Sequence, residues 1–190
     1  MHEPLIMSFG GVRPRIAPDA WIAPTAVVIG DVEIGAQSGI WFHCVLRGDV
    51  NRIRIGARTN IQDGTIVHVN RNDPDTQIGD DVTVGHAAII HACTLRNRAF
   101  VGMGATVLDG AVIEEGGLLA AGALLTPGKR IGVNELWAGS PARLVRVMSA
   151  EERAGFDANA VNYVTMGARF RAEVASGLEP AGRSAHLLGG

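Results

Sequence analysis

Aliphatic residues recur at every sixth position through most of the first 135 residues of this chain. Neither the 3.6-residue spacing of an amphipathic helix nor the alternation of a half-buried strand explains this pattern. A period of six is typical of β-helices. The runs are separated by extra residues after Leu46 and Val67 and by one missing residue before Leu95. The repeat consists of two long runs and two shorter runs between them: Ile16, Ile22, Val28, Ile34, Ile40 and Leu46; Leu95, Val101, Val107, Ile113, Leu119, Leu125 and Ile131; Ile55, Ile61 and Val67; and Ile78, Val84 and Ile90.

This period has a direct consequence for the backbone. Each hexad supplies one short strand and one corner, and three hexads close a triangular coil with the aliphatic side chains inside. Hydrogen bonds between successive coils hold them about 4.8 Å apart. Because only 5% of the residues are aromatic, the core must be aliphatic, and the 25 glycines suit the many corners. The repeat therefore predicts a mainly β protein, with a triangular solenoid of about six to seven coils over residues 12–137.

The end of the repeat predicts a cap, because a solenoid would otherwise expose its core. Ser149 and Glu152 have the spacing of a capping box, which predicts a C-terminal α-helix over residues 149–171. The tail over residues 176–190 is rich in Gly, Ser and Ala, and we expect it to be flexible. No second domain is indicated, so residues 1–190 are expected to form a single domain. The expected apolar face of the helix contains Phe156, Ala160, Tyr163, Val164 and Phe170.

Composition and charge argue against several kinds of partner. The net charge is −2 and the chain has no basic block, so nucleic acid is not expected to bind. No apolar run approaches the roughly 20 residues of a membrane span, and no signal peptide is indicated. Cys44 and Cys93 lie in no paired motif, which suits buried free thiols in a reducing compartment. We therefore expect a cytoplasmic protein without membrane contact.

The phase of the repeat brings polar residues together on one face of the solenoid. Leu46, Val67 and Ile90 begin hexads on the same face in successive coils, which we call face B. Arg47, His68 and His91 directly follow these aliphatic residues, so they form an outward stack on face B. His68 and His91 should lie one coil apart, about 4.8 Å at the backbone. Imidazole nitrogens at that spacing can share one metal ion, with metal–nitrogen bonds of about 2.0–2.1 Å.

A third histidine lies on the preceding face, which we call face A. Asp63 and His86 each follow an inward aliphatic residue by two positions, so they should stack one coil apart. A corner separates them from the face B histidines of the same chain. His86 can reach the ion of a neighbouring subunit if face A of one subunit packs against face B of the next, and repeating that contact by 120° closes a trimer. The same contact would bring Arg47 towards Asp63 of the neighbour. Alternatively, one histidine acts as a general base.

Three motifs together resemble those of one family. R-G-D occurs at Arg47–Asp49, and N-I-Q-D occurs at Asn60–Asp63 with a histidine six residues after its Gln. G-H at Gly85 and His86 is followed by a second histidine five residues later. This combination resembles the gamma-class carbonic anhydrases and their bacterial homologues of the hexapeptide-repeat superfamily. The resemblance implies a homotrimer of left-handed parallel β-helices with zinc at the subunit interfaces. His68 and His91 of one chain and His86 of its neighbour would be the ligands.

The resemblance also implies an activity, the reversible hydration of CO2 to bicarbonate by metal-bound hydroxide. It implies that Gln62 orients the hydroxide or the substrate and that Asn60 supports Gln62. Arg47, Asp49 and Asp63 would form an interface ion-pair network. Iron or cobalt can replace zinc, because histidine sites do not discriminate sharply between these metals.

The chain departs from the family pattern where its best-known active members carry glutamates that shuttle protons. Val50 occupies the first such position, and Arg71 lies near the second, in the short loop Val69–Gln77. Asp73 and Asp75 are acidic residues of that loop without an assigned place. Hydration generates a proton in each cycle, so we expect turnover to be limited by proton export, and activity to be low.

Two other functions fit this solenoid. One is acyl transfer from a CoA or carrier thioester, in which an interface histidine deprotonates the acceptor. The other is a metal-stabilised trimeric scaffold without turnover. Three convergent histidine ligands favour the carbonic anhydrase-like interpretation over acyl transfer.

Overall fold

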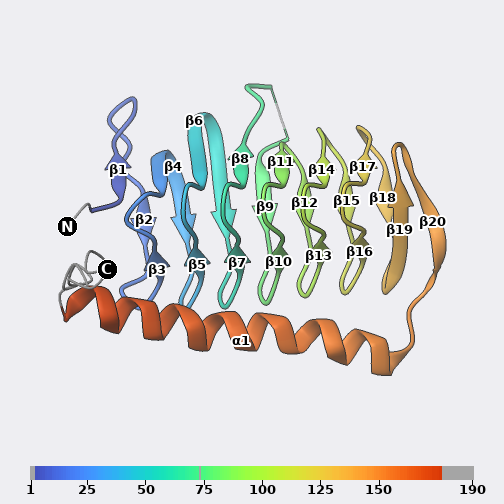
Figure 1. The fold of residues 1–190 in the computed structure, drawn as a ribbon. Helices are drawn as coiled ribbons and strands as arrows, with labels where there is room; N and C mark the ends of the chain where they lie inside the picture. Colours follow the sequence, from blue (N-terminus) through green and yellow to red (C-terminus); the bar gives the residue numbers. More distant parts are fainter. Residues whose placement is uncertain (1–2, 73, 177–190) are drawn as a thin grey trace, which may run out of the picture.

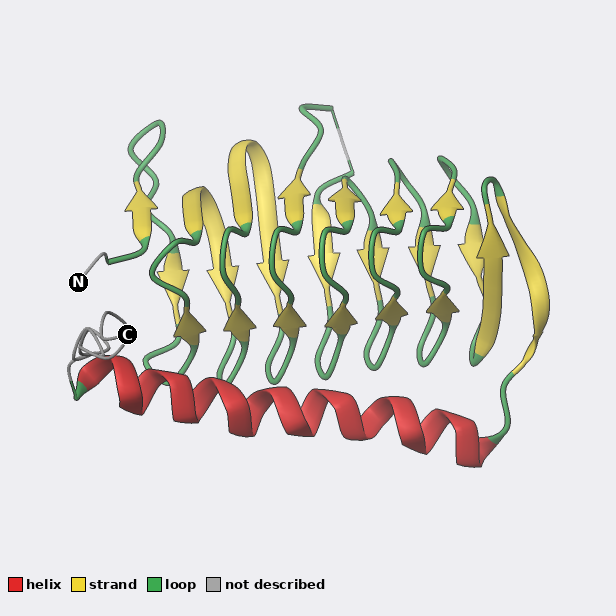
Figure 2. Cartoon of the chain, in the orientation of Figure 1, coloured by secondary structure: helices red, strands yellow, loops and turns green. Residues whose placement is uncertain are grey.

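The chain folds into a parallel β-solenoid with one long helix beside it, as the computed structural model shows (Figures 1 and 2). The structure describes residues 3–72 and 74–176. Within these ranges each of the three faces has seven parallel strand segments, so the described solenoid has seven coils. Figure 1 shows the coils stacked along one axis, with α1 (Ala150–Ala175) running along the stack. The predicted β-solenoid with a C-terminal helix is confirmed.

Face A is an eight-stranded sheet whose first seven strands are parallel. The eighth strand pairs antiparallel with the seventh and closes the C-terminal end of the solenoid. The strands of face A in chain order are β3 (Trp21–Ile22), β5 (Gly39–Ile40), β7 (Asn60–Ile61), β10 (Thr83–Val84), β13 (Phe100–Val101), β16 (Leu118–Leu119), β19 (Glu135–Gly139) and β20 (Ala142–Val147).

The other two faces, B and C, form one continuous twelve-stranded sheet. Two long strands, β4 (Val27–Ile34) and β6 (Val45–Ile55), bend across the corner and belong to both faces. Face B is completed by β1 (Leu5–Met7), β8 (Ile66–His68), β11 (Ile89–His91), β14 (Thr106–Val107) and β17 (Leu124–Leu125). Face C is completed by β2 (Arg15–Ile16), β9 (Thr76–Ile78), β12 (Thr94–Leu95), β15 (Val112–Ile113) and β18 (Arg130–Ile131).

The core is the aliphatic ladder that the repeat predicts. All repeat residues from Val28 to Ile131 are buried, whereas Ile16 and Ile22, in the first coil, are only half-buried. The extra residues after Leu46 form the bend of β6, and those after Val67 form the loop between β8 and β9. Both insertions lie outside the ladder, so they leave the inward period intact.

Helix α1 begins where the capping box predicts. Ser149 is its N-cap, and the side chains of Ser149 and Glu152 each bond the other's backbone N–H. The helix ends at Ala175 rather than at residue 171, because Val174 still packs on the core and favours another turn. The predicted flexible tail beyond Ser176 lies outside the described residues.

Aromatic residues attach the helix to the first coils. Phe170 packs against Trp21, Trp41 and Phe42, with ring centroids 5.3–5.8 Å apart. Tyr163 meets the edge of Trp41 at 5.2 Å. The helix therefore runs antiparallel to the growth of the solenoid and returns the C-terminal part of the described chain to the first coil (Figure 1).

Cys44 and Cys93 are buried free thiols, as the sequence predicted. Burial raises the pKa of both to about 12, so neither is a thiolate near neutral pH. Among the described residues, no helix combines the length and apolar character needed to cross a membrane.

A core truncation tests the ladder. Ile113 is fully buried in β15, so Ile113→Ala should lower the free energy of unfolding by about 2–5 kcal/mol, through lost burial and a residual cavity. Val133 is exposed one coil later, and Val133→Ala should change the free energy of unfolding by about 0.5 kcal/mol or less. Urea unfolding at one protein concentration measures both. Equal effects of the two substitutions would contradict the assigned inward register.

Candidate metal centre

Two histidines and an arginine form a column on the outer side of face B. The backbone register pairs Arg47 with His68 and His68 with His91. Their inward neighbours, Leu46, Val67 and Ile90, are fully buried. The stack that the repeat phase predicted is therefore present.

The two imidazole rings of the column face each other. Nδ1 of His68 lies 3.2 Å from Nε2 of His91, and the ring centroids are 5.2 Å apart. Two nitrogens that each lie about 2.0–2.1 Å from a tetrahedral ion are separated by about 3.3 Å. The pair therefore has the spacing of two ligands of one zinc-sized ion.

A carboxylate holds the far side of each ring. Asp49 Oδ1 lies 3.0 Å from Nε2 of His68, and Asp109 Oδ1 lies 2.5 Å from Nδ1 of His91. Histidines that ligate metals commonly donate their other N–H to such a partner, which fixes the tautomer and the ring orientation. Partial burial raises the pKa of Asp49, but hydrogen bonds from His68 and Arg47 outweigh this effect and lower it below the usual value.

The bend of β6 places Asp49 next to His68. Gly30 and Gly48 pair across β4 and β6, where the two strands approach closely. A Cβ at Gly30 would clash with the carbonyl oxygen of Gly48, and a Cβ at Gly48 would clash with that of Asp31. The central glycine of R-G-D is therefore required by the close approach of two backbones.

Arg47 forms an ion pair with Asp49 of the same chain. The sequence placed Arg47 towards Asp63 of a neighbouring subunit, so within one chain it has a different partner. The pairing keeps Asp49 between a guanidinium and an imidazole.

His86 lies in the turn after β10, at the corner between faces A and B. Its Nδ1 is 2.8 Å from Oδ2 of Asp63, as expected from their stacking one coil apart. Both side chains are about two-fifths exposed. In the part of the chain that the structure describes, no group of three or more His, Cys, Asp or Glu side chains is arranged to hold a metal ion.

Asn60 and Gln62 are buried on face A, close to His86. Nε2 of Gln62 donates to Oδ1 of Asn60 at 3.0 Å, and Nδ2 of Asn60 donates to Oγ1 of Thr83 at 2.9 Å. This chain of hydrogen bonds fixes the Gln62 amide. Gln62 and His86 line a groove of about 380 Å³ between face A and α1. The groove has apolar walls that include Phe100, Met103, Leu118 and Phe156.

The structure adds two residues that the sequence had not assigned to the site. Asp109 follows Val107 by two positions in the coil after His91, so the phase count could have placed it near that histidine. Tyr163 was predicted to belong to the apolar face of the helix and was not assigned to the site, and it lines the groove with Gln62 and His86. Burial and the Asp63 carboxylate raise the pKa of Tyr163, so it stays protonated at neutral pH.

Asp75, the described acidic residue of the loop after His68, does not contact the histidines. Asp75 instead accepts hydrogen bonds from Arg52 Nε and Gln77 Nε2, both at 2.6 Å. Arg71 is exposed, and Asp73 lies outside the described residues.

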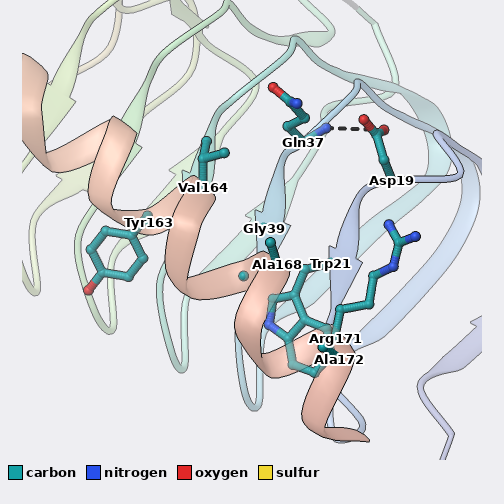
Figure 3. A pocket seen from close by; sticks show the side chains of 10 residues that line it. Asp19, Trp21, Gln37, Gly39, Tyr163, Val164, Ala168, Arg171 and Ala172 are labelled. Atoms are coloured by element: carbon teal, nitrogen blue, oxygen red, sulfur yellow. Dashed lines mark hydrogen bonds between the residues drawn. The ribbon is translucent and has the colours of Figure 1, made fainter. Parts of the chain in front are cut away.

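A wider cavity, of about 470 Å³, lies between the first coils and the C-terminal part of α1 (Figure 3). Asp19, Gln37 and Arg171 supply its charged and polar lining, and the Gln37 backbone N–H donates to Asp19 at 3.3 Å. It contains none of the predicted site residues, so we place the candidate site at the histidines.

Comparisons with known proteins agree on one family. No protein-family model matches the chain. Gamma carbonic anhydrase 2, mitochondrial, of Arabidopsis thaliana is 47% identical over 166 residues, which are 85% of this chain and 60% of the plant protein. The chain therefore spans less than two thirds of that relative. The probable carbonic anhydrase of Methanocaldococcus jannaschii is 48% identical, over 80% of this chain and 94% of its own length.

A solved structure supports the same grouping. The hexapeptide transferase family protein of Anaplasma phagocytophilum is 49% identical and has a TM-score of 0.84, covering 90% of this chain and 99% of its own. Protein YrdA of Escherichia coli (strain K12) is 50% identical, over 80% of this chain and 85% of its length. The chain belongs to the gamma carbonic anhydrase-like family of hexapeptide-repeat proteins.

Proposed function

We propose that this protein is a zinc-dependent carbonic anhydrase-like enzyme that interconverts CO2 and bicarbonate at sites shared between the subunits of a trimer. The observation that carries this proposal is the separation of 3.2 Å between facing nitrogens of His68 and His91, each ring being backed by a carboxylate. Relatives named carbonic anhydrases support the same activity.

Zinc held by these residues would supply Lewis acidity that lowers the pKa of water to about 7. His68 and His91 would hold it from one subunit and His86 from the next. The Asp63 carboxylate would hold the His86 ring through Nδ1, leaving Nε2 for the metal. Iron or cobalt would fit the same ligands.

An apolar column beside the histidines supports subunit contact on face B. The register stacks Leu5, Val27, Val45, Ile66 and Ile89 on the outer side, one in each successive coil. Ile66 and Ile89 are 47% and 42% exposed next to His68 and His91. A contiguous apolar strip of this kind typically marks an interface. A neighbour that covers the strip with the corner carrying Asp63 and His86 would complete the ligand set.

The second set of residues would orient the reactants. Gln62, fixed by Asn60, lies in the groove with His86, so its amide would face CO2 or bicarbonate beside the metal. Arg47, Asp49 and Asp63 would position the metal-binding rings and steady the interface. Hydration releases a proton. Because Asp75 is engaged by Arg52 and Gln77, we infer slow proton export and low turnover.

Acyl transfer is the second candidate function. Its support is that solved relatives are named a hexapeptide transferase family protein and a putative acetyltransferase. The facing histidines favour the metal site, because a general base needs only one imidazole. A trimeric scaffold without turnover is the third candidate.

We also infer a cytoplasmic location, since the two buried free thiols suit a reducing compartment.

Metal content and CO2 hydration test the activity directly. We expect about one zinc per chain, and we expect His91→Ala to lose most zinc and the catalysed rate in stopped-flow CO2 hydration. His43→Asn is the control, since His43 is exposed and Asn tolerates its positive φ of 60°. Zinc-loaded wild type that hydrates CO2 no faster than buffer would refute the reaction, and acyl transfer or the scaffold would remain.

Mixed trimers test the shared site. His86→Ala and His91→Ala subunits each lack a ligand, so each alone should be inactive. If the chains are mixed in equal amounts before assembly, about a quarter of the interfaces should combine an intact face B with an intact His86. Zinc content and hydration rate should recover to about that fraction of wild type. No recovery in mixed trimers verified by native mass spectrometry would mean that the ligands do not come from two subunits.

The amide chain allows a separate test of orientation. Gln62→Leu should lower kcat/KM by up to about 100-fold, because it removes a positioned polar group. Zinc content should not change. Asn60→Ala should also lower the free energy of unfolding by about 1–3 kcal/mol, since it leaves buried partners unpaired. A normal kcat/KM in zinc-loaded Gln62→Leu would exclude Gln62 from the reaction.

A further inference from the structure

The Asp109 carboxylate is placed to hold His91 from the next coil. Asp109 follows β14 by two residues, and its backbone is fixed because Gly128 N–H donates to Asp109 O at 2.9 Å. Its two carboxylate oxygens have different partners. Oδ1 contacts His91 Nδ1 at 2.5 Å, and Oδ2 accepts from Asn70 Nδ2 at 2.8 Å. A carboxylate held at both oxygens cannot rotate away from the imidazole without breaking a hydrogen bond.

Asn70 connects three segments that are far apart in the sequence. It lies two residues after His68, and its side chain reaches Asp109 across 39 residues of sequence. Its backbone oxygen accepts from Asn51 Nδ2, at the bend of β6, at 3.1 Å. Its side-chain oxygen accepts from the backbone N–H of Asn72 at 3.4 Å. Asn70, at the start of the loop after His68, is therefore hydrogen-bonded to the coil that contains Asp109.

The Asp109 carboxylate is placed to accept a hydrogen bond from His91 Nδ1–H, because the Asn70 amide donates to its other oxygen. With Nδ1 protonated, the lone pair of His91 is on Nε2, the nitrogen that faces His68.

We propose that Asn70 and Asp109 are positioning residues that lock His91 in its metal-binding tautomer and orientation, so that Asn70, two residues after His68, controls how fast the metal leaves. This inference rests on the proposed metal site. Asn70 holds the carboxylate that resists rotation of the His91 ring, and such a rotation would remove one ligand from the metal.

Zinc release to a chelator in excess tests the brace. Asn70→Ala should speed zinc release about 10-fold, and Asp109→Asn about 10-fold to 100-fold. Asn72→Ala is the matched control, because Asn72 engages Asn70 through its backbone only. Adding Asn70→Ala to Asp109→Asn should cause little further change if Asn70 acts through the carboxylate. Release rates equal to wild type in both single variants would overturn the proposal.

Nitrogen-15 NMR of the metal-free protein tests, without zinc, whether Asn70 and Asp109 fix the tautomer of His91. We expect His91 to be the Nδ1–H tautomer in wild type and Asn72→Ala, and a mixture of tautomers in Asn70→Ala. A predominantly Nε2–H His91 in wild type would overturn the proposal even if zinc binds. If wild type binds no zinc but His91 has the expected tautomer, the proposed function is wrong. The proposed control of zinc release is then wrong as well, although Asp109 still fixes the His91 tautomer. Thermal unfolding of each variant separates these effects from loss of fold.

Discussion

The spacing between coils, about 4.8 Å as hydrogen-bonded strands impose, is the constraint on which the structure depends. It stacks equivalent positions of successive coils, so that residues 23 apart in sequence become neighbours, as His68 and His91 do. The inward ladder of aliphatic side chains sets the phase of that stacking. Because side chains alternate between inside and outside, fixing the core also fixes which polar residues line the outer surface.

The fold and part of the site were predictable for this reason. The period placed Val67 and Ile90 inside, and the histidines that follow them had to stack outside. It also placed Asp63 beside His86, which the 2.8 Å contact confirms. The same count of positions in the repeat could have placed Asp109 near His91. An aspartate followed by a glycine, however, is first interpreted as a turn residue. Its role depends on rotamers and on Asn70, and a loop side chain that reaches across 39 residues leaves no periodic signal.

The end of the helix and the place of Tyr163 show a different limit. The packing of α1 depends on which residues the first coils present to it, such as Trp21 and Trp41. The sequence indicated an apolar helix face without identifying the surface that receives it. In the same way, Arg47 could be assigned to an ion pair from its charge, but its partner Asp49 depended on the bend of β6.

In the function proposed above, catalysis at the candidate site would depend on subunit assembly. Face B provides two histidines and an apolar strip, while the corner next to face A provides the third histidine with Asp63 behind it. Each histidine ring contacts one carboxylate, and Asn70 hydrogen-bonds the carboxylate beside His91. A subunit alone would thus hold two prepared ligands and present the third to a neighbour.

We propose that one metal ion is shared by His68 and His91 of one subunit and His86 of the next. Anomalous diffraction at the zinc edge from crystals of the zinc-loaded protein tests it most directly. We expect one anomalous peak per chain at a subunit interface, about 2.0–2.1 Å from a nitrogen of each of the three histidines. A peak bound by histidines of a single chain, or none between His68 and His91, would contradict it.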